Sequence, residues 1–122
     1  MMPTILVVDD SLIDRRIAGA CVEEAGATPL YAENGREALE LVRKSTPDIV
    51  LTDLQMPEMD GLELVCSIQT ENPRLPVILM TAHGSETTAV EALRAGAVSY
   101  IPKTNLKRDL SLTLQNMLDT VT

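Results

Sequence analysis

Three runs of consecutive apolar residues constrain the fold of this chain more than any other feature of its sequence. They occupy residues 5–8, 49–51 and 77–80. Polar or charged residues follow each run at once: Asp9 and Asp10 after the first, Thr52 and Asp53 after the second, and Thr81 after the third. Because a strand with one face in water alternates apolar and polar residues, continuously apolar strands indicate a sheet covered on both faces. The runs therefore predict a parallel sheet between two layers of helices.

Helical patterns occupy the segments between the apolar runs. Their expected beginnings and ends are marked by Ser11 and Gly26, Asn34 and Pro47, the two ends of 61–70, Ser85 and Gly96, and Asn105. Residues 28–32 and 98–101 are weaker candidates for two further strands. A strand followed by a helix, five times over, predicts one doubly wound, flavodoxin-like α/β domain over residues 1–122. Its sheet has five parallel strands, accompanied by five helices.

The composition of the 122 residues excludes several classes of protein. Ten basic residues against eighteen acidic ones give a net charge of −8, which disfavours direct binding to nucleic acid or to an anionic membrane surface. No apolar run approaches the about 20 residues of a membrane span, and no basic segment precedes the first run as in a signal peptide. The chain is therefore expected in the cytoplasm, with Cys21 and Cys66 as buried thiols.

The chemistry of this chain is expected at the carboxyl ends of its strands, which meet at one edge of a parallel sheet. The residues at such ends are Asp9, Asp10, Asp53, Thr81 and Lys103. Two carboxylates about 4 Å apart repel each other by about 4 kcal/mol at an effective dielectric of about 20, so these acids require a proton or a cation. Mg²⁺ prefers carboxylate ligands together with water and a phosphate. With a lysine and a hydroxyl nearby, this edge predicts a site for a phosphoryl group.

No other common catalytic arrangement is legible in the sequence. It has no glycine-rich loop of the kind that cradles nucleotide phosphates, and its one histidine, His83, has no obvious nucleophile as a partner. A carboxylate can itself attack phosphorus and form an acyl phosphate. Asp53, at the end of an apolar strand and before a loop, is the candidate for that role.

Several motifs in a fixed order connect these residues to a known family. They are residues 5–10, ILVVDD; 53–61, DLQMPEMDG; 76–82, PVILMTA; 96–97, GA; and 100–103, YIPK. With these motifs at this spacing, the sequence resembles the receiver domain of two-component response regulators over essentially its whole length. The resemblance implies a signal-transduction module that is switched by a phosphoryl group on Asp53. The donor would be the phosphohistidine of a sensor histidine kinase or of a phosphotransfer protein.

The resemblance also implies a cofactor and its ligands. Asp10 and Asp53 would bind Mg²⁺ directly, together with the backbone carbonyl of Gln55, and Asp9 would act mainly through a water molecule. Such a phosphoprotein takes up one phosphoryl group as an aspartyl phosphate. It promotes its own phosphotransfer and dephosphorylation, but it is not an enzyme that turns over a substrate.

The family further implies how the phosphoryl group is read. Lys103 and Thr81 would hold the phosphoryl oxygens. Thr81 would move toward the phosphoryl group while Tyr100 rotates inward, which remodels the face made by the fourth helix, the fifth strand and the fifth helix. An output domain or a downstream protein would read this face, and the family also allows a homodimer through it. No output domain is expected within residues 1–122.

Three positions are variable in the family or depart from its usual pattern. Gln55 and His83 stand two residues after Asp53 and Thr81, where the family tunes the lifetime of the phosphoryl group by admitting or shielding water. Thr104 replaces the proline that usually follows the lysine. A cis peptide bond before a residue other than proline costs about 2.5–4 kcal/mol, so the sequence leaves the geometry of this loop open between trans and strained forms.

Two other functions stay open at this point. A phosphorylation-independent pseudo-receiver would serve as a docking module, although the complete set of acids and the lysine argues against it. A Mg²⁺-dependent phosphohydrolase that works through an aspartyl phosphate would commonly carry a second acid two residues after the nucleophile. The residue at that position is Gln55, which cannot act as a general acid or base.

Overall fold

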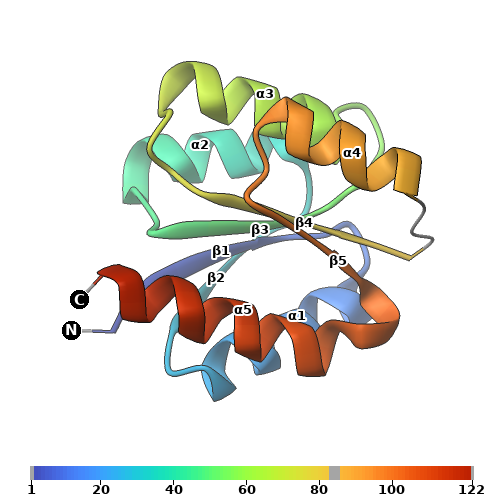
Figure 1. Cartoon of the computed structure of the whole chain (residues 1–122). Helices are drawn as coiled ribbons and strands as arrows, with labels where there is room; N and C mark the ends of the chain where they lie inside the picture. The colour runs from blue at the N-terminus through green and yellow to red at the C-terminus, as the bar shows by residue number, and fades with distance from the viewer. Residues whose placement is uncertain (1, 83–85, 122) are drawn as a thin grey trace.

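The computed structural model describes residues 2–82 and 86–121, apart from the side chains of Glu86 and residues 118–121. Its strands are β1 (Thr4–Val8), β2 (Thr28–Ala32), β3 (Ile49–Asp53), β4 (Val77–Thr81) and β5 (Ser99–Pro102). Its helices are α1 (Leu12–Glu24), α2 (Gly35–Ser45), α3 (Gly61–Glu71), α4 (Glu86–Ala95) and α5 (Leu106–Val121). The strands form one parallel sheet in the order β2-β1-β3-β4-β5, which confirms the predicted doubly wound, flavodoxin-like fold (Figure 1).

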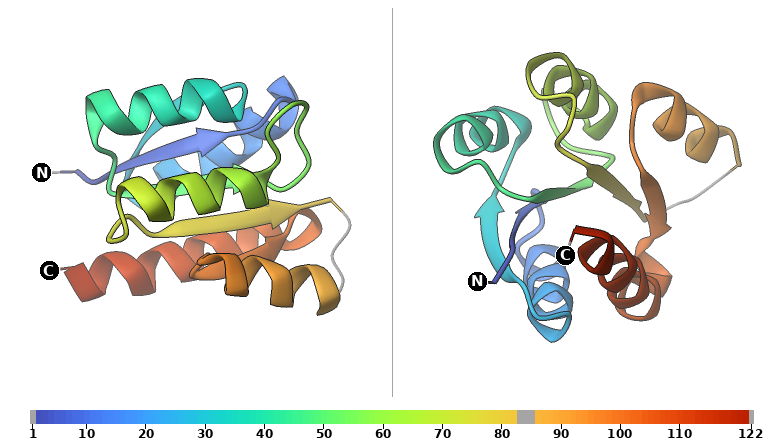
Figure 2. Two further views of the ribbon diagram at one scale, coloured as in Figure 1. Left: turned by 90° about the horizontal axis from the view of Figure 1, so that it is seen from above. Right: turned by 60° about the vertical axis from the view of Figure 1, so that its left-hand side comes forward.

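Helices cover both faces of the sheet. The layer of α2, α3 and α4 lies on one face, and α1 and α5 lie on the other (Figure 2). In β1, Leu6 and Val8 pack toward the first layer and Ile5 and Val7 toward the second, and all four are fully buried. Each such side chain contributes about 1.5–3 kcal/mol relative to an exposed one. Alternate residues of one strand therefore serve two cores, which explains why the strands are apolar throughout.

Polar side chains begin the helices where the sequence predicts. Asn34 Oδ1 accepts a hydrogen bond from the backbone N–H of Glu37 at 2.8 Å, at the start of α2. Asp60 Oδ1 accepts one from the N–H of Glu63 at 2.9 Å, at the start of α3. Ser11 caps α1 in the same way. These bonds satisfy backbone donors that the first turn of a helix otherwise leaves without partners.

The beginnings of the last two helices add detail to the prediction. Ser85, the predicted capping residue of α4, lies outside the described residues. A 3-10 turn at Lys103–Asn105 precedes α5, which begins directly after the predicted Asn105. The Lys103–Thr104 peptide bond is trans, and no peptide bond among the described residues is cis. Replacing the usual proline by Thr104 is therefore accommodated without the costly isomer.

The prediction that both cysteines are buried is wrong for one of them. Cys21 is buried in α1, whereas Cys66 is exposed on α3. α3 packs against the sheet through Leu64, Val65 and Ile68. Because an α-helix turns by about 100° per residue, position 66 points away from the stripe that these three residues form. The apolar neighbours of Cys66 in sequence therefore lie on a different face of the helix.

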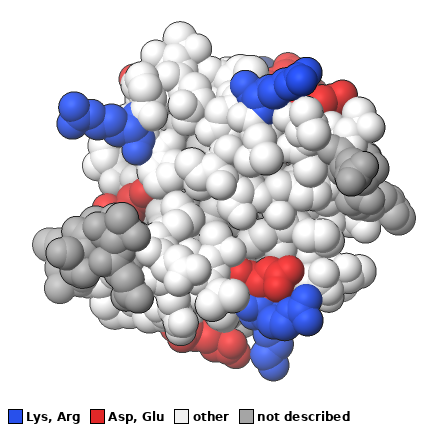
Figure 3. Space-filling model, viewed as in Figure 1, with Lys and Arg blue, Asp and Glu red and all other residues white. Residues whose placement is uncertain are grey.

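The surface made by α4, β5 and α5 has few charges at its centre. Side chains of Lys, Arg, Asp and Glu lie mainly near the margins of this view (Figure 3). Exposed apolar side chains on or next to these elements are Val90, Leu93, Val98 and Leu112. No helix within residues 2–82 and 86–121 is long and apolar enough to cross a membrane.

The order of the strands determines where a ligand can approach. β1 lies between β2 and β3, so the chain builds the sheet outward from β1 in both directions. The loops after β1 and β3 consequently run to opposite faces, and open α/β sheets bind their ligands at the carboxyl ends of the two strands where the loops separate in this way. We call this side of the sheet the carboxyl edge. Asp9 follows β1 there, and Asp53 is the last residue of β3.

Candidate functional site at the carboxyl edge

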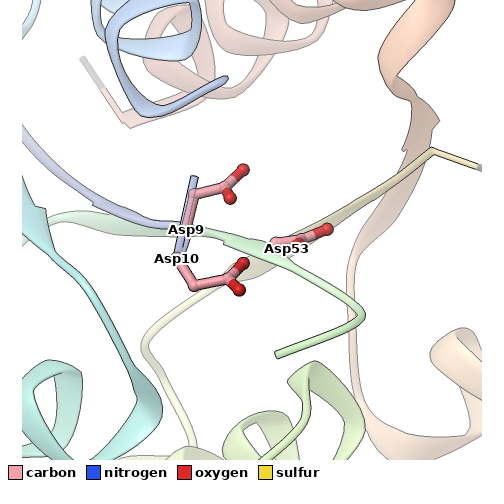
Figure 4. A group of neighbouring side chains, drawn as sticks. All are labelled: Asp9, Asp10 and Asp53. Atoms are coloured by element: carbon pink, nitrogen blue, oxygen red, sulfur yellow. The ribbon is translucent and has the colours of Figure 1, made fainter. Parts of the chain in front are cut away.

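Three aspartates converge at the carboxyl edge, as the sequence predicts. Asp9 and Asp10 follow β1, and Asp53 ends the neighbouring β3. One carboxylate oxygen from each residue lies within 4.8 Å of the others, and the three side chains reach into the same space (Figure 4). Asp9 and Asp53 are buried, whereas Asp10 is exposed. The cluster therefore has a buried base and one side open to solvent.

Lys103 reaches the cluster from beyond β5, the strand at one edge of the sheet. It begins the 3-10 turn after β5, and only 15% of its side chain is exposed. Its Nζ lies 2.8 Å from Asp9 Oδ2 and 3.4 Å from Asp53 Oδ1. Burial by itself would lower the pKa of Lys103, but hydrogen bonds to Asp14 and Asp9 outweigh burial and raise this pKa. The ammonium is therefore charged at any physiological pH.

The position of Asp9 is fixed by several hydrogen bonds. Its Oδ2 accepts from Lys103, while its Oδ1 accepts from the backbone N–H of Ser11 at 2.9 Å. Arg15 Nη1 donates to the carbonyl oxygen of Asp9 at 2.9 Å, and Arg15 Nη2 lies 3.9 Å from Glu33 Oε1. A fully buried carboxylate requires such partners to offset its loss of hydration. Asp9 is therefore a fixed part of the site.

Asp53 has an unusually weak acidity for an aspartate. Burial, together with the nearby charge of Asp9, raises the pKa of its carboxyl from 3.8 to about 6, against the opposing effect of Lys103. The backbone next to Asp53 is also held in place, because the N–H of Leu54 donates a hydrogen bond to the Met80 carbonyl at 2.9 Å. Asp53 is thus held rigidly in a place where its negative charge is costly. A cation beside it would remove that cost.

The donor set fits a hard divalent cation. Three carboxylates supply oxygen ligands within one small volume, and Mg²⁺ is bound in proteins by one or two such groups with water in the remaining positions. The Asp10 carboxylate has no hydrogen bond or ion pair with the residues that the structure describes, and it faces solvent. It is therefore free to act as a ligand. A dication here would also relieve the repulsion that raises the pKa of Asp53.

The remaining predicted residues lie around this cluster. Thr81 ends β4 beside β3 and is buried. Tyr100 lies in β5 opposite Leu79 and packs against the core under α2, α3 and α4. Its hydroxyl is buried and has no hydrogen-bond partner among the described residues. Gln55 is exposed in the loop after β3.

His83, a predicted lifetime-tuning residue, lies outside the described residues.

Two residues of the site are not predicted by any motif in the sequence. Asp14 Oδ2 lies 2.8 Å from Lys103 Nζ, as close as Asp9 does. Arg15 anchors the chain after β1 through the carbonyl of Asp9. In the sequence, Asp14 is an ordinary acid in the first turn of a helix, where the helix dipole favours it. No local pattern indicates that a lysine 89 positions away would reach it.

The fold and the cluster together define a flavodoxin-like α/β domain with an acidic cluster that could hold a metal ion at its topological switch point. Residues 5–115 match the family model of the response regulator receiver domain. The chain therefore belongs to the receiver domain family of two-component response regulators. The predicted family is confirmed.

Relatives of known sequence and structure agree with this family. The chain is similar to the transcriptional regulatory protein ZraR of Klebsiella oxytoca, with 46% identity over 114 residues that cover 93% of this chain and 26% of ZraR. It is also similar to the DNA-binding transcriptional regulator NtrC of Escherichia coli strain K12, with 45% identity over 97 residues that cover 80% of this chain and 21% of NtrC. The chain thus spans about a quarter or less of the length of these relatives.

The receiver domain of the Francisella response regulator 1452 has a similar structure, with a TM-score of 0.90 and 28% identity. The match covers 98% of this chain and 99% of that one. A CheY-like receiver domain protein from Methanospirillum hungatei JF-1 has a TM-score of 0.89 at 28% identity, and the match covers 98% of this chain and 96% of that one. Both likenesses extend over nearly the whole chain.

Proposed function

We propose that this chain is a phosphorylation-switched receiver in which Asp53 accepts a phosphoryl group from the phosphohistidine of a partner histidine kinase or phosphotransfer protein. An oxygen of Asp53 forms the new bond to phosphorus while the P–N bond of the donor breaks. The leaving imidazole nitrogen takes the electron pair and a proton from water. The observation that carries this proposal is the convergence of Asp9, Asp10, Asp53 and Lys103 at one edge of the sheet.

The charges of the site suit such a transfer. Asp10 and Asp53, with the backbone carbonyl of Gln55, are the proposed direct ligands of Mg²⁺, and Asp9 acts mainly through water. When bound, Mg²⁺ supplies positive charge that stabilises the charge developing on the phosphoryl oxygens. Lys103 would supply a further positive charge beside the acceptor, since its Nζ already lies 3.4 Å from Asp53 Oδ1. The Thr81 hydroxyl is proposed to donate a hydrogen bond to another phosphoryl oxygen.

Thr81 and Tyr100 are the proposed switch residues. Thr81 ends β4, and Tyr100 is the second residue of the neighbouring β5. The hydroxyl of Tyr100 is buried and has no hydrogen-bond partner among the described residues. An unsatisfied buried hydroxyl costs about 1–3 kcal/mol, so small movements that give it a partner are favourable. A phosphoryl group brings about −1.5 to −2 charges and new acceptor oxygens to Asp53. This change can therefore reach the α4–β5–α5 face through Thr81 and Tyr100.

Two exposed apolar groups support separate partner surfaces. The first group lies on α1, directly after the acidic pair, where a kinase or phosphotransfer protein must approach: Leu12, Ile13 and Ile17. The second lies on the α4–β5–α5 face, which suits an output domain, a downstream protein or a second copy of the chain: Val90, Leu93 and Val98.

We further propose a cytoplasmic location, because phosphohistidine donors and the two free thiols suit a reducing compartment.

The proposed function is tested by incubating the chain with Mg²⁺ and acetyl phosphate and measuring its intact mass. Wild type is expected to gain one phosphoryl group, and Asp53→Asn is expected to gain none. Asp48→Asn is the matched control, because it removes an aspartate whose Oδ2 accepts from Thr4 N–H at the opposite edge of the sheet. It is expected to gain the phosphoryl group as wild type does.

The same assay separates the alternatives. A chain that gains no mass with acetyl phosphate or with any phosphorylated kinase would be a pseudo-receiver that serves for docking only. Continuous release of phosphate, many times per protein, from a phosphomonoester would identify a phosphohydrolase. The stoichiometric gain of one group, followed by slow loss, is the outcome that the receiver proposal requires.

A further inference from the structure

We propose that Asp14 is a positioning residue that holds the Lys103 ammonium in the unphosphorylated protein and thereby opposes phosphoryl binding at Asp53. This inference rests on the proposed function, because it concerns how the same site takes up a phosphoryl group. Asp14 does not belong to the set of residues that the sequence motifs supply. Its carboxylate nevertheless makes one of the two shortest contacts of Lys103.

Asp9, Asp14 and Asp53 compete for the hydrogen-bond donors of Lys103. Its ammonium has three hydrogen-bond donors. Two of them make short bonds of 2.8 Å, one to Asp9 and one to Asp14. Asp53, the proposed phosphoacceptor, lies farther away at 3.4 Å. In this state the ammonium is therefore held mainly by residues other than the one that would carry the phosphoryl group.

The two short bonds differ in how readily they can be exchanged. Asp9 is fully buried, and its second oxygen is bound by the backbone of Ser11. Asp14 is at the solvent side of the site, with 39% of its side chain exposed, so water can replace the lysine as its partner. A bond that water can replace is the one that an incoming phosphoryl oxygen displaces. Lys103 is therefore expected to leave Asp14 and to keep Asp9.

The charge of Asp14 acts in the same direction as its contact. A phosphoryl group on Asp53 adds negative charge at a place that Asp9, Asp10 and Asp14 already make acidic. Neutralising Asp14 weakens this repulsion and frees one donor of Lys103. A residue that stabilises only the unphosphorylated state shifts the equilibrium away from the phosphorylated one by its differential interaction. Asp14 thus raises the free-energy cost of placing a phosphoryl group on Asp53.

Asp14→Asn is the variant that tests this role, and beryllofluoride is the probe, since it mimics a phosphoryl group on a carboxylate. Its apparent Kd is measured at saturating Mg²⁺ by NMR titration of the full 122-residue chain. Loss of one exposed ion pair changes an equilibrium constant by up to about fivefold, and a charge-assisted bond by about tenfold or more. Asp14→Asn is therefore expected to bind beryllofluoride about three- to tenfold more tightly.

Two controls distinguish this role from a general effect of charge or of helix stability. Asp60→Asn removes a negative charge near the same edge but keeps the capping oxygen of α3, and it is expected to change the Kd less than twofold. In a Lys103→Ala background only the direct repulsion remains, so Asp14→Asn is expected to tighten binding by a smaller factor than it does when Lys103 is present. An acid that served only the helix dipole of α1 would have the same effect with and without the lysine.

A second readout needs neither Mg²⁺ nor the probe. In magnesium-free urea unfolding, the effects of Asp14→Asn and Lys103→Ala on the unfolding constant are expected to be non-additive by about threefold or more, because the two side chains are in contact. Beryllofluoride binding to Asp14→Asn that equals that of wild type, or is weaker, would overturn the inference, as would additive unfolding effects. If wild type itself neither binds beryllofluoride nor takes up a phosphoryl group, the proposed function fails first, and the inference fails with it.

Discussion

Removing the charge of Asp53 is expected to stabilise the magnesium-free protein at neutral pH. The pKa of this carboxyl is raised from 3.8 to about 6 by burial and by the charge of Asp9, against the opposing effect of Lys103. A shift of one pKa unit corresponds to about 1.4 kcal/mol, so the ionised carboxylate costs the folded state about 3 kcal/mol above pH 6. Asp53→Asn has no such charge. It is therefore expected to be more stable than wild type by up to about 3 kcal/mol at pH 7.5.

The pH dependence of this difference follows from the direction of the shift. Because the folded carboxyl holds its proton more strongly than the unfolded one, its contribution to stability is fully present below pH 3.8 and is lost as the pH rises through about 6. Wild type and Asp53→Asn are thus expected to converge in stability as the pH falls from 6 to 4. The difference between the two proteins isolates this carboxyl from other groups that titrate in the same range.

Urea unfolding followed by far-ultraviolet circular dichroism measures this difference in the presence of EDTA at pH 7.5, 6, 5 and 4. Asp48→Asn reports the general effect of one lost carboxylate at the opposite edge of the sheet. Mg²⁺ at about a hundred times its Kd is expected to stabilise wild type by about 2.7 kcal/mol and Asp53→Asn by much less. A variant that is no more stable than wild type at pH 7.5, or a difference that is constant from pH 7.5 to 4, would refute the reasoning.

Three further substitutions test other parts of the structure. Asp10→Ala is expected to abolish Mg²⁺-dependent phosphorylation while leaving the fold intact or more stable, and Mg²⁺ binding as tight as in wild type would show that the proposed ligand set is wrong. Gly61→Ala would place a Cβ 2.5 Å from the backbone oxygen of Asp53, which cannot move aside, so urea unfolding should show a loss of about 1–3 kcal/mol. Asn34→Ala removes the 2.8 Å cap of α2 and should cost about 1 kcal/mol in the same assay, whereas Asn34→Asp should cost little.

Much of the fold follows from short-range patterns in the sequence. The apolar runs at 49–51 and 77–80 became β3 and β4, extended by two residues and by one residue into the polar positions that follow. The apolar runs do not predict this extension, because backbone pairing between the strands continues past the last apolar side chain. The exposed Cys66 shows a second limit: apolar neighbours in sequence do not decide which face of a helix a residue occupies.

The sequence by itself determined that acids, a hydroxyl and a lysine would stand at the ends of parallel strands. Periodicity and turn residues act over a few positions, and the carboxyl ends of parallel strands meet at one edge whatever the order of the strands. Only the tertiary structure decided that β1 and β3 are neighbours, that Lys103 reaches Asp14 across 89 positions, and that burial weakens the acidity of Asp53. These properties depend on distances and solvent exposure between residues remote in the chain, and no local pattern encodes them.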